Sequence, residues 1–248
     1  MNSNILDAFN EYFEMIPADS DPLKNEVYKL RYQVYCLETG FEKSERYPER
    51  AESDEYDSHS VHYLIRHRKL GIYAATTRLI LPDMTNKEKL FPIEKYTQID
   101  SNDVLTTIPR VNLAEASRFC VSKEFKKRKN EIGTLTSIPS DWESDFTRDE
   151  RRVFPSLSLA LFACLIKMSD ENSIYYWYAV MEPALIRYFT TFGVHFIGIG
   201  PVVDYHGNRQ PCMIKVSDLL DGVAEKDPGI WNMMTNKGQV GENARGGA

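Results

Sequence analysis

Apolar positions near the N-terminus recur at helical spacing. Residues 5–16 place hydrophobic side chains every three or four positions, which predicts an amphipathic helix. A second stripe of this kind begins after Asp21, an expected N-cap followed by Pro22, and ends at Gly40, an expected residue just past a helix end. We therefore expect two helices that each bury one apolar face against a core.

The middle of the chain changes to strand spacing. Residues 61–66 and 70–82 are rich in apolar and β-branched side chains and predict a hairpin. A short helix is expected within 88–96, before a further strand at 113–122, LAEASRFCVS. The acidic segment between the second helix and the hairpin, 41–60, is expected to be a loop.

Helical and strand patterns alternate in the second half. Ser156 is expected to cap an apolar helix through Met168, and SIYYWYAVM at 173–181 has the composition of a central strand. A helix opened by Pro183 and strands at 195–200 and 210–216 complete the pattern. This order predicts an α/β (α+β) fold in which helices flank a central, mixed, twisted β-sheet.

Domain limits follow from the same pattern. We expect one domain over residues 1–220, with 123–152 as an insertion or mobile loop because that stretch is charged and irregular. Residues 221–248 are expected to form a partly disordered tail.

The composition narrows the classes of function. The 248 residues carry a net charge of −6, which argues against general nucleic-acid binding. The N-terminus lacks the features of a signal peptide, and the uncharged run 153–166 is too short to span a bilayer, so the cytoplasm and no stable membrane insertion are expected. Four dispersed cysteines and five histidines form no metal motif, and we predict no metal site.

Charged residues interrupt the apolar strand at 113–122. By strand alternation Glu115 and Ser117 share one face, while Arg118 points to the other. Buried charges are costly without partners, so these groups should pair with one another or with a ligand. If Glu115 and Arg118 serve one site, a β-bulge must separate them, and bulges are frequent beside active sites.

Further charges precede and follow the first hairpin strand. The acidic segment ESDEYD contains Glu52, Asp54 and Asp57, while Arg31 lies on the second helix and Arg78 on the second hairpin strand. Taken singly, each of these residues is more typical of a solvated surface or of a structural ion pair.

Four segments, taken in order, resemble a known family: KLRYQVYCLETGF, ESDEYDSHSVHYLI, TTRLILP and AEASRFCVS. They are similar to the acyl-homoserine-lactone (autoinducer) synthases and the N-acyl amino acid synthases, which share the GNAT-type acyltransferase fold. The sequence segment RYQVYCLETGFE is especially typical of acyltransferases associated with PEP-CTERM/exosortase systems. The resemblance extends over roughly residues 23–216.

The resemblance implies roles for the charged residues. In the family they form a network around an amine acceptor and an acyl thioester, whose donor is acyl-carrier protein or coenzyme A. The matching residues here are Arg31, Asp54, Asp57, Arg78, Glu115, Ser117 and Arg118. No permanently bound cofactor is implied.

Two departures from the family bear on the substrates. Autoinducer synthases have a tryptophan near the position of Phe41, which makes S-adenosylmethionine a less secure substrate. The usual GNAT phosphate loop is replaced by SKEFKKRKNEIG, whose only glycine is Gly133. This replacement weakens a coenzyme A assignment and leaves room for a carrier-protein donor.

Acyl transfer from a thioester to an amine needs a proton acceptor and an oxyanion site. Glu115 is the first candidate base and Glu52 the second, because an α-amino group has a pKa of about 7.7–8.0 and needs only modest help. The resemblance implies that backbone N–H groups at Phe119, Cys120 and Val121 contact the oxyanion and the pantetheine arm. Cys120 is not expected to be acylated, since GNAT chemistry is direct transfer.

The acceptor and the donor each suggest a binding surface. A carboxylate on the acceptor is matched by an arginine, Arg31 or Arg78, although each arginine is at least as suited to holding an aspartate in place. A basic cluster is suited to steering an acidic carrier protein or to solubilising a loop, and it comprises Lys123, Lys126, Lys127, Arg128 and Lys129.

Three functions remain open from the sequence. The leading hypothesis is an N-acyl amino acid synthase that uses acyl-carrier protein. The second is an autoinducer synthase that consumes S-adenosylmethionine. The third is a non-catalytic module that binds acyl-carrier protein, although such a binder has no need of a buried carboxylate.

Overall fold

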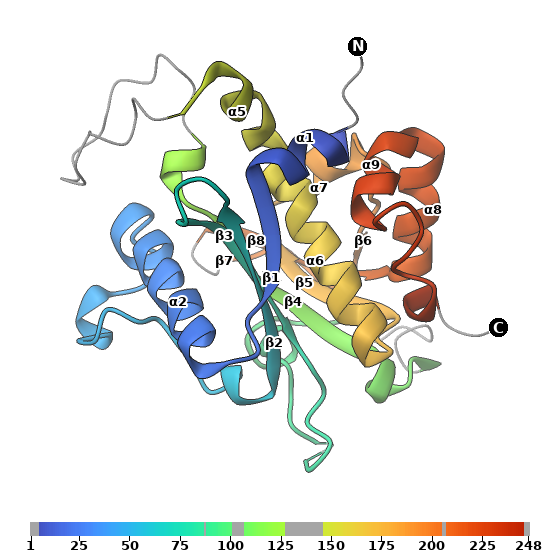
Figure 1. Ribbon diagram of the computed structural model, residues 1–248. Coiled ribbons are helices and arrows are strands. Elements are labelled where there is room, and N and C mark those ends of the chain that lie inside the picture. The colour runs from blue at the N-terminus through green and yellow to red at the C-terminus, as the bar shows by residue number, and fades with distance from the viewer. Residues whose placement is uncertain (1–4, 87, 101–106, 127–145, 205–206, 246–248) are drawn as a thin grey trace. The chain divides into compact units, whose positions relative to one another are not determined.

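The structure of the protein is a computed structural model that describes residues 5–86, 88–100, 107–126, 146–204 and 207–245. Its strands hydrogen-bond in the order β1-β2-β3-β4-β5-β8-β6, with β7 paired to β8 (Figure 1). The bounds are β1 Phe13–Pro17, β2 Ser60–His67, β3 Tyr73–Ile80, β4 Leu113–Val121, β5 Tyr176–Met181, β6 Ile197–Gly198, β7 Val203–Asp204 and β8 Asn208–Lys215.

Helices flank this mixed, mostly antiparallel sheet, as the sequence pattern predicts. The α-helices are α1 Ile5–Tyr12, α2 Asp21–Tyr32, α3 Pro92–Tyr96, α5 Arg148–Val153, α6 Leu157–Asn172, α7 Pro183–Thr190, α8 Val216–Lys226 and α9 Pro228–Met234. A π-helix, Gln33–Glu38, continues α2 directly. The prediction of an α/β sheet flanked by helices is confirmed.

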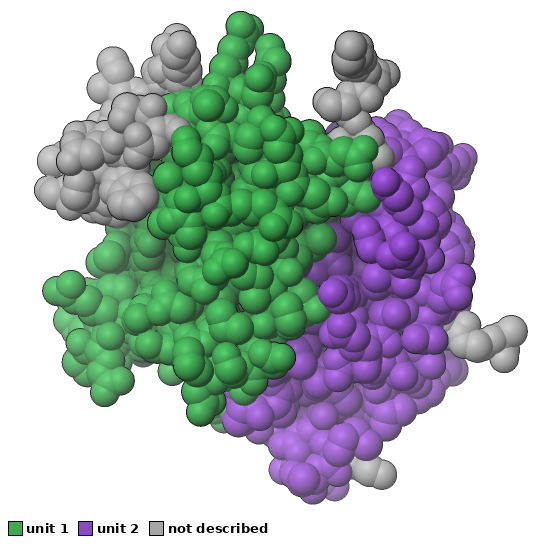
Figure 2. All heavy atoms as spheres, viewed as in Figure 1, with its two compact units in different colours: residues 1–55, 62–77, 118–161 green, residues 56–61, 78–117, 162–248 purple. Residues whose placement is uncertain are grey.

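The chain divides into two compact units (Figure 2). Unit 1 comprises residues 1–55, 62–77 and 118–161, and unit 2 comprises 56–61, 78–117 and 162–248. Neither unit is a contiguous segment of sequence, because β2, β3, β4 and α6 each run from one unit into the other.

Unit 1 builds its core between α2 and its strands. The apolar face of α2 supplies Val27 and Leu30, which cluster with Leu64 of β2 and Cys120 of β4. β1 pairs antiparallel with β2 from Phe13 opposite His67 to Pro17 opposite Tyr63. This pairing corrects the sequence prediction of one helix over 5–16, because strand pairing overrides the helical spacing after Tyr12.

Unit 2 is organised by β5. This strand runs parallel to β4 from Leu113 opposite Tyr176 to Glu115 opposite Tyr178, and antiparallel to β8. Trp177 is fully buried and donates its indole N–H to Ser169 Oγ at 2.7 Å. The central strand predicted at 173–181 is therefore confirmed, and its aromatic side chains serve the core.

The C-terminal segment contains regular structure. The second half of α8 and all of α9 lie within 221–248, the stretch expected to form a partly disordered tail, and Val223 and Met233 on them are buried. The Asp170 carboxylate accepts backbone N–H groups from Gly241, Asn243 and Ala244, the first at 3.0 Å. Buried apolar side chains and backbone hydrogen bonds to Asp170 attach this segment to the rest of unit 2.

The predicted loop at 123–152 also contains regular structure. Its last residues form α5, where Thr147 and Glu150 make a reciprocal capping box. The helical stretch 148–172 is long and apolar enough to resemble a membrane span, but 78% of its most apolar window is buried in the structure. Such burial is typical of a core helix.

Candidate active site

Four charged residues of unit 1 form a connected network, here called the Glu52 cluster: Arg31, Glu52, Asp54 and Arg118. The last turn of α2 carries Arg31, whose Nε donates to Glu52 Oε2 at 2.5 Å, and both side chains are fully buried. Arg118 Nη2 donates to Glu52 Oε1 at 2.9 Å and to Asp54 Oδ2 at 3.2 Å. The Glu52 N–H donates to the carbonyl of Tyr28 at 2.9 Å, which fixes the loop on α2.

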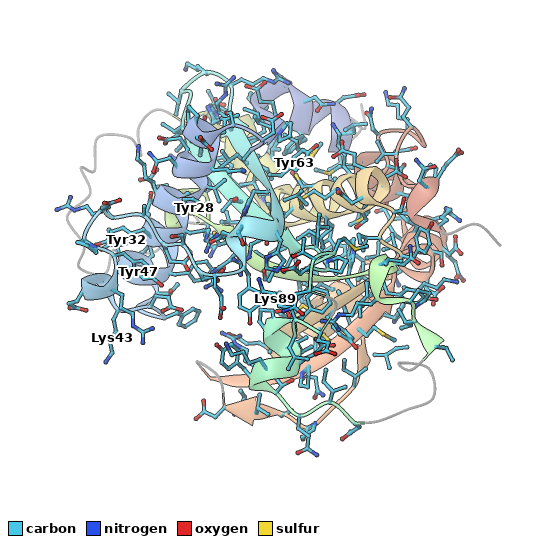
Figure 3. The ribbon with its side chains drawn as sticks, turned by 90° about the horizontal axis from the view of Figure 1, so that it is seen from below. Tyr28, Tyr32, Lys43, Tyr47, Tyr63 and Lys89 are labelled. Carbon is cyan, nitrogen blue, oxygen red and sulfur yellow. The ribbon has the colours of Figure 1, made fainter. Side chains whose placement is uncertain are left out.

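Accessibility differs within the Glu52 cluster. Arg118 and Asp54 keep 23% and 25% of their side-chain surface exposed, whereas Arg31 and Glu52 keep none. Arg31 also lies 5.4 Å from the ring centroid of Tyr28, which Figure 3 labels on α2. The buried pair therefore supports the cluster, and Arg118 and Asp54 are the members that a ligand can reach.

The two arginines decide the charge state of Glu52. Burial alone would raise its pKa, but the charges and hydrogen bonds of Arg31 and Arg118 outweigh burial and lower the pKa to about 2. A carboxylate with so low a pKa is a weak proton acceptor near neutral pH. The geometry places Glu52 between the two arginines, and its role as the second candidate base stays a prediction.

The backbone of β4 is irregular at Arg118. Its φ of +49° lies in the left-handed region that non-glycine residues rarely adopt, although the flanking residues are extended. A residue in this conformation is the starting residue of one type of β-bulge. The backbone irregularity at Arg118 is compatible with the bulge expected if Glu115 and Arg118 serve one site, and that shared site stays a prediction.

Burial keeps the thiols near this strand protonated. The pKa of Cys120 is raised to about 12, chiefly by burial, and the pKa of half-buried Cys36 is raised to about 11. A thiol with such a pKa carries almost no thiolate at neutral pH and is a poor nucleophile. These values agree with direct acyl transfer.

Unit 2 holds a second group, here called the Arg78 cluster: Asp57, Arg78 and Ser117. Arg78 lies on β3, and its Nη1 donates to Asp57 Oδ1 at 2.8 Å while its Nε donates to Ser117 Oγ at 2.9 Å. The Arg78 side chain is only 1% exposed. The arginine thus bridges an aspartate and a serine, and the proposed substrate-binding role of Arg78 stays a prediction.

Glu115 is buried beside an apolar cluster of unit 2. Its Oε2 accepts the backbone N–H of Ile93, at the start of α3, at 2.8 Å. Its register partner Tyr178 has a pKa raised to about 12, mainly by burial, with a contribution from the Glu115 charge. Glu115 is therefore a desolvated carboxylate that a backbone N–H holds in a fixed orientation.

The remaining residues predicted to bind the donor or the acceptor differ in their exposure to solvent. Phe119 is partly exposed, Cys120 and Val121 are buried, and Phe41 exposes 37% of its surface after the π-helix. Lys126 is exposed. Lys127 and Arg128, also predicted to contact the donor, lie outside the described residues. Among the residues that the structure describes, no group of three His, Cys, Asp or Glu is placed to hold a metal ion.

The sequence did not indicate three polar residues on the π-helix that follows α2: Gln33, Tyr35 and Glu38. Tyr35 lies one turn after Arg31, and its ring centroid is 5.4 Å from the Arg118 guanidinium carbon. Gln33 and Glu38 mark the two ends of the π-helix and hydrogen-bond to each other. The spacing of four between Arg31 and Tyr35 offered a signal for Tyr35, whereas a π-helix leaves no such pattern.

Comparison with known proteins places these clusters in a known type of domain. Residues 30–135 match the model of the acetyltransferase (GNAT) domain. Both charged clusters, Glu115 and the irregular strand β4 fall inside that segment. The chain has a GNAT fold. No curated protein matches the sequence significantly.

Solved structures of similar fold include acyl-homoserine-lactone synthases and an N-acyl amino acid synthase. TofI, solved with an inhibitor and MTA, has a TM-score of 0.57 at 18% identity and covers 88% of this chain and 99% of its own. BjaI, a CoA-dependent acyl-homoserine-lactone synthase solved with SAM and isopentyl-CoA, has a TM-score of 0.53 at 18% identity and covers 87% of this chain and 88% of its own. FeeM, an N-acyl amino acid synthase from uncultured soil microbes, has a TM-score of 0.52 at 12% identity and covers 85% of this chain and 93% of its own.

The GNAT domain and these folds support an N-acyltransferase enzyme. At identities below one in five the structural likeness concerns the fold, so the substrates must be argued from the residues of this chain. The fold part of the sequence resemblance is confirmed.

Proposed function

We propose that the protein is an N-acyl amino acid synthase, which transfers a fatty acyl group from an acyl-carrier-protein or coenzyme A thioester to the amine of an amino acid. The observation that carries the proposal is the pairing of Arg118 with Asp54 at 3.2 Å, with both side chains about one quarter exposed. An amino acid carries an ammonium and a carboxylate on adjacent atoms. A neighbouring carboxylate and guanidinium complement these two charges.

The irregular backbone of β4 supports the proposed chemistry. In the reaction the amine nitrogen attacks the thioester carbonyl, a C–N bond forms, and the negative charge on oxygen needs N–H donors. Arg118 has a left-handed backbone within β4, and the N–H groups of the residues after it are the proposed donors. The tetrahedral intermediate then breaks its C–S bond and releases the thiol.

Glu115 is the proposed base. It takes one proton from the attacking amine, directly or through water, and that proton is available to the departing thiolate. Its burial and its fixed orientation on the Ile93 N–H suit a group that must act in one geometry. With Glu52 held ionised between two arginines, Glu115 is the stronger of the two candidates.

The autoinducer-synthase hypothesis has support of its own. The methionine portion of S-adenosylmethionine is an amino acid, so the Arg118–Asp54 pair suits it as well, and BjaI of similar fold was solved with SAM. The partly exposed Phe41, near where that family has tryptophan, favours the amino-acid acceptor. Consumption of S-adenosylmethionine with formation of a lactone would establish the alternative.

The cellular setting follows from the sequence motifs. The segment RYQVYCLETGFE resembles acyltransferases of PEP-CTERM/exosortase systems, and we propose a cytoplasmic enzyme of such a system.

Mass spectrometry of lipid extracts from cells that express the chain tests the proposed product without a choice of acceptor. The expected result is an N-acyl amino acid absent from cells carrying the Glu115→Gln variant. Acyl-carrier binding without thiol release for any amine would instead indicate a non-catalytic binding module.

A further inference from the structure

A π-helix ends the second helical segment and changes which residues share a face. Its backbone bonds span five residues, as in the Thr39 N–H to Val34 carbonyl bond of 3.0 Å. In an α-helix, residues five apart point about 140° away from each other. In a π-helix they lie one turn apart on one side. Gln33 Nε2 consequently donates to Glu38 Oε1 at 2.8 Å.

This geometry directs the Glu38 carboxylate to the end of β4. Its Oε2 accepts the Lys123 N–H at 2.9 Å, and its Oε1 also receives the Ser122 hydroxyl at 3.4 Å. Gln33 additionally donates to Ser122 Oγ at 3.1 Å. Ser122 is 1% exposed, and its N–H donates to the Ala74 carbonyl at 2.8 Å, so the donors are rigidly held.

The donors around Glu38 are of the kind that bind a phosphate. A backbone N–H at a strand end, a carboxamide and a hydroxyl converge on one pair of oxygen atoms, and exposed Lys126 follows three residues later. Here the chain fills that position with its own carboxylate. An external phosphate group must either displace Glu38 or bind beside a negative charge.

We infer that Glu38 is a specificity-determining residue that disfavours a highly charged acyl donor. This inference rests on the proposed function, in which the donor arm contacts residues 119–121 of β4 and reaches Ser122 and Lys123 beyond them. Coenzyme A brings a diphosphate and a further phosphate to this end of the strand. A carrier protein brings a single phosphodiester, so it meets less repulsion from the Glu38 carboxylate.

The test is direct binding of coenzyme A and of inorganic pyrophosphate, measured by titration calorimetry at low salt. Two variants distinguish the effect of the Glu38 negative charge from the effect of the volume that its side chain occupies. Glu38→Gln removes the charge but fills the site, while Glu38→Ala also frees the Lys123 N–H and the Ser122 hydroxyl. Glu49→Gln makes the same charge change at an exposed position. Thermal unfolding of each variant establishes that it is folded.

Both Glu38 variants are expected to bind coenzyme A about tenfold tighter or more than wild type, with Ala at least equal to Gln. Glu49→Gln should bind as wild type does, and the gain should shrink as salt is added. A purely structural role for Glu38 would lower thermal stability and leave anion binding unchanged. Folded Glu38→Gln that binds coenzyme A no tighter than wild type overturns the inference.

The binding assay does not depend on turnover. If the variants gain affinity for pyrophosphate while no acyl thioester is consumed, the role of Glu38 in excluding anions stands and the proposed acyl transfer fails. If wild type transfers acyl groups and the variants show no gain in coenzyme A binding or in kcat/KM for acyl-CoA, the proposed function stands and the inference about Glu38 fails.

Discussion

Arg118 Nη2 donates to Glu52 Oε1 at 2.9 Å, although the two residues are 66 positions apart in the sequence. The bond joins an irregular point of β4 to the loop after α2. Glu52 also pairs with fully buried Arg31, so one carboxylate balances two guanidinium groups. We expect this carboxylate to matter more for stability than any exposed charge of unit 1.

Replacing Glu52 with Gln leaves two arginines without their shared anion. Loss of one partner from a buried ion pair typically costs about 3–5 kcal/mol of the free energy of unfolding. Urea denaturation of Glu52→Gln should show a loss of this size. Exposed Glu49→Gln, which removes the same charge three residues away, should change stability by about 0.5 kcal/mol or less.

The same carboxylate predicts an acid dependence of stability. Its folded-state pKa of about 2 lies below the unfolded value of about 4.3, so the stabilisation is fully present above the unfolded pKa. It is lost as pH falls through the folded pKa. Between about pH 5 and pH 2 the free energy of unfolding of wild type should therefore fall more steeply than that of Glu52→Gln. Parallel curves for the two proteins would contradict the role of Glu52.

The left-handed conformation of Arg118 can be tested apart from its charge. Arg118→Gly and Arg118→Ala both lose the guanidinium, but glycine adopts a positive φ without strain and alanine does not. The Gly variant should be more stable than the Ala variant by about 1 kcal/mol. At Ala116, whose φ is not positive, substitution by Gly should destabilise β4 instead. Equal stability of the two Arg118 variants would indicate a regular strand.

The proposed base predicts a loss of rate without a loss of fold. Glu115→Gln retains an oxygen that accepts the Ile93 N–H, so its melting temperature should stay near that of wild type. Its kcat/KM for acyl transfer should fall about 10²–10⁴-fold. Unchanged turnover in a folded Glu115→Gln protein would remove Glu115 as the base and leave it as a capping residue for α3.

Direct transfer predicts that no acyl-enzyme forms. Because burial raises the pKa of Cys120 to about 12, Cys120→Ala should keep kcat within about threefold of wild type. Intact-mass spectrometry during turnover should find no added acyl group. An acyl adduct that disappears in Cys120→Ala would show covalent catalysis.

The residues that periodicity describes well were predictable, and those set by tertiary contacts were not. The apolar stripe of α2, the strand β5 and the positive φ of Gly40 follow from local patterns. The strand β1 does not, since Phe13 to Pro17 continue a helical spacing and become extended by pairing with β2. Helices α8 and α9 were not predicted, although Leu219, Leu220 and Val223 on α8 have helical spacing and are buried in the structure.

In the candidate site, too, some features were predictable from the sequence and others depend on tertiary structure. Burial cost predicted that Arg31 and Arg118 would pair with other charges or with a ligand, but the sequence did not indicate that Glu52 is the carboxylate they share. Strand alternation also predicted that a bulge must separate Glu115 from Arg118 if the two serve one site, and the positive φ of Arg118 is compatible with such a bulge. The position of Glu38 was not accessible, because it depends on a π-helix that brings residues five apart onto one side.

The most direct test of acyl transfer is the release of free thiol from a long-chain acyl-carrier protein by the purified enzyme, followed with and without a mixture of amino acids. We predict thiol release that depends on an amino acid. Mass spectrometry should detect a stoichiometric N-acyl amino acid, and the Glu115→Gln variant should form much less of it. Thiol release that requires S-adenosylmethionine would contradict the proposed function. So would the absence of thiol release from both acyl-carrier protein and acyl-coenzyme A with every amine offered.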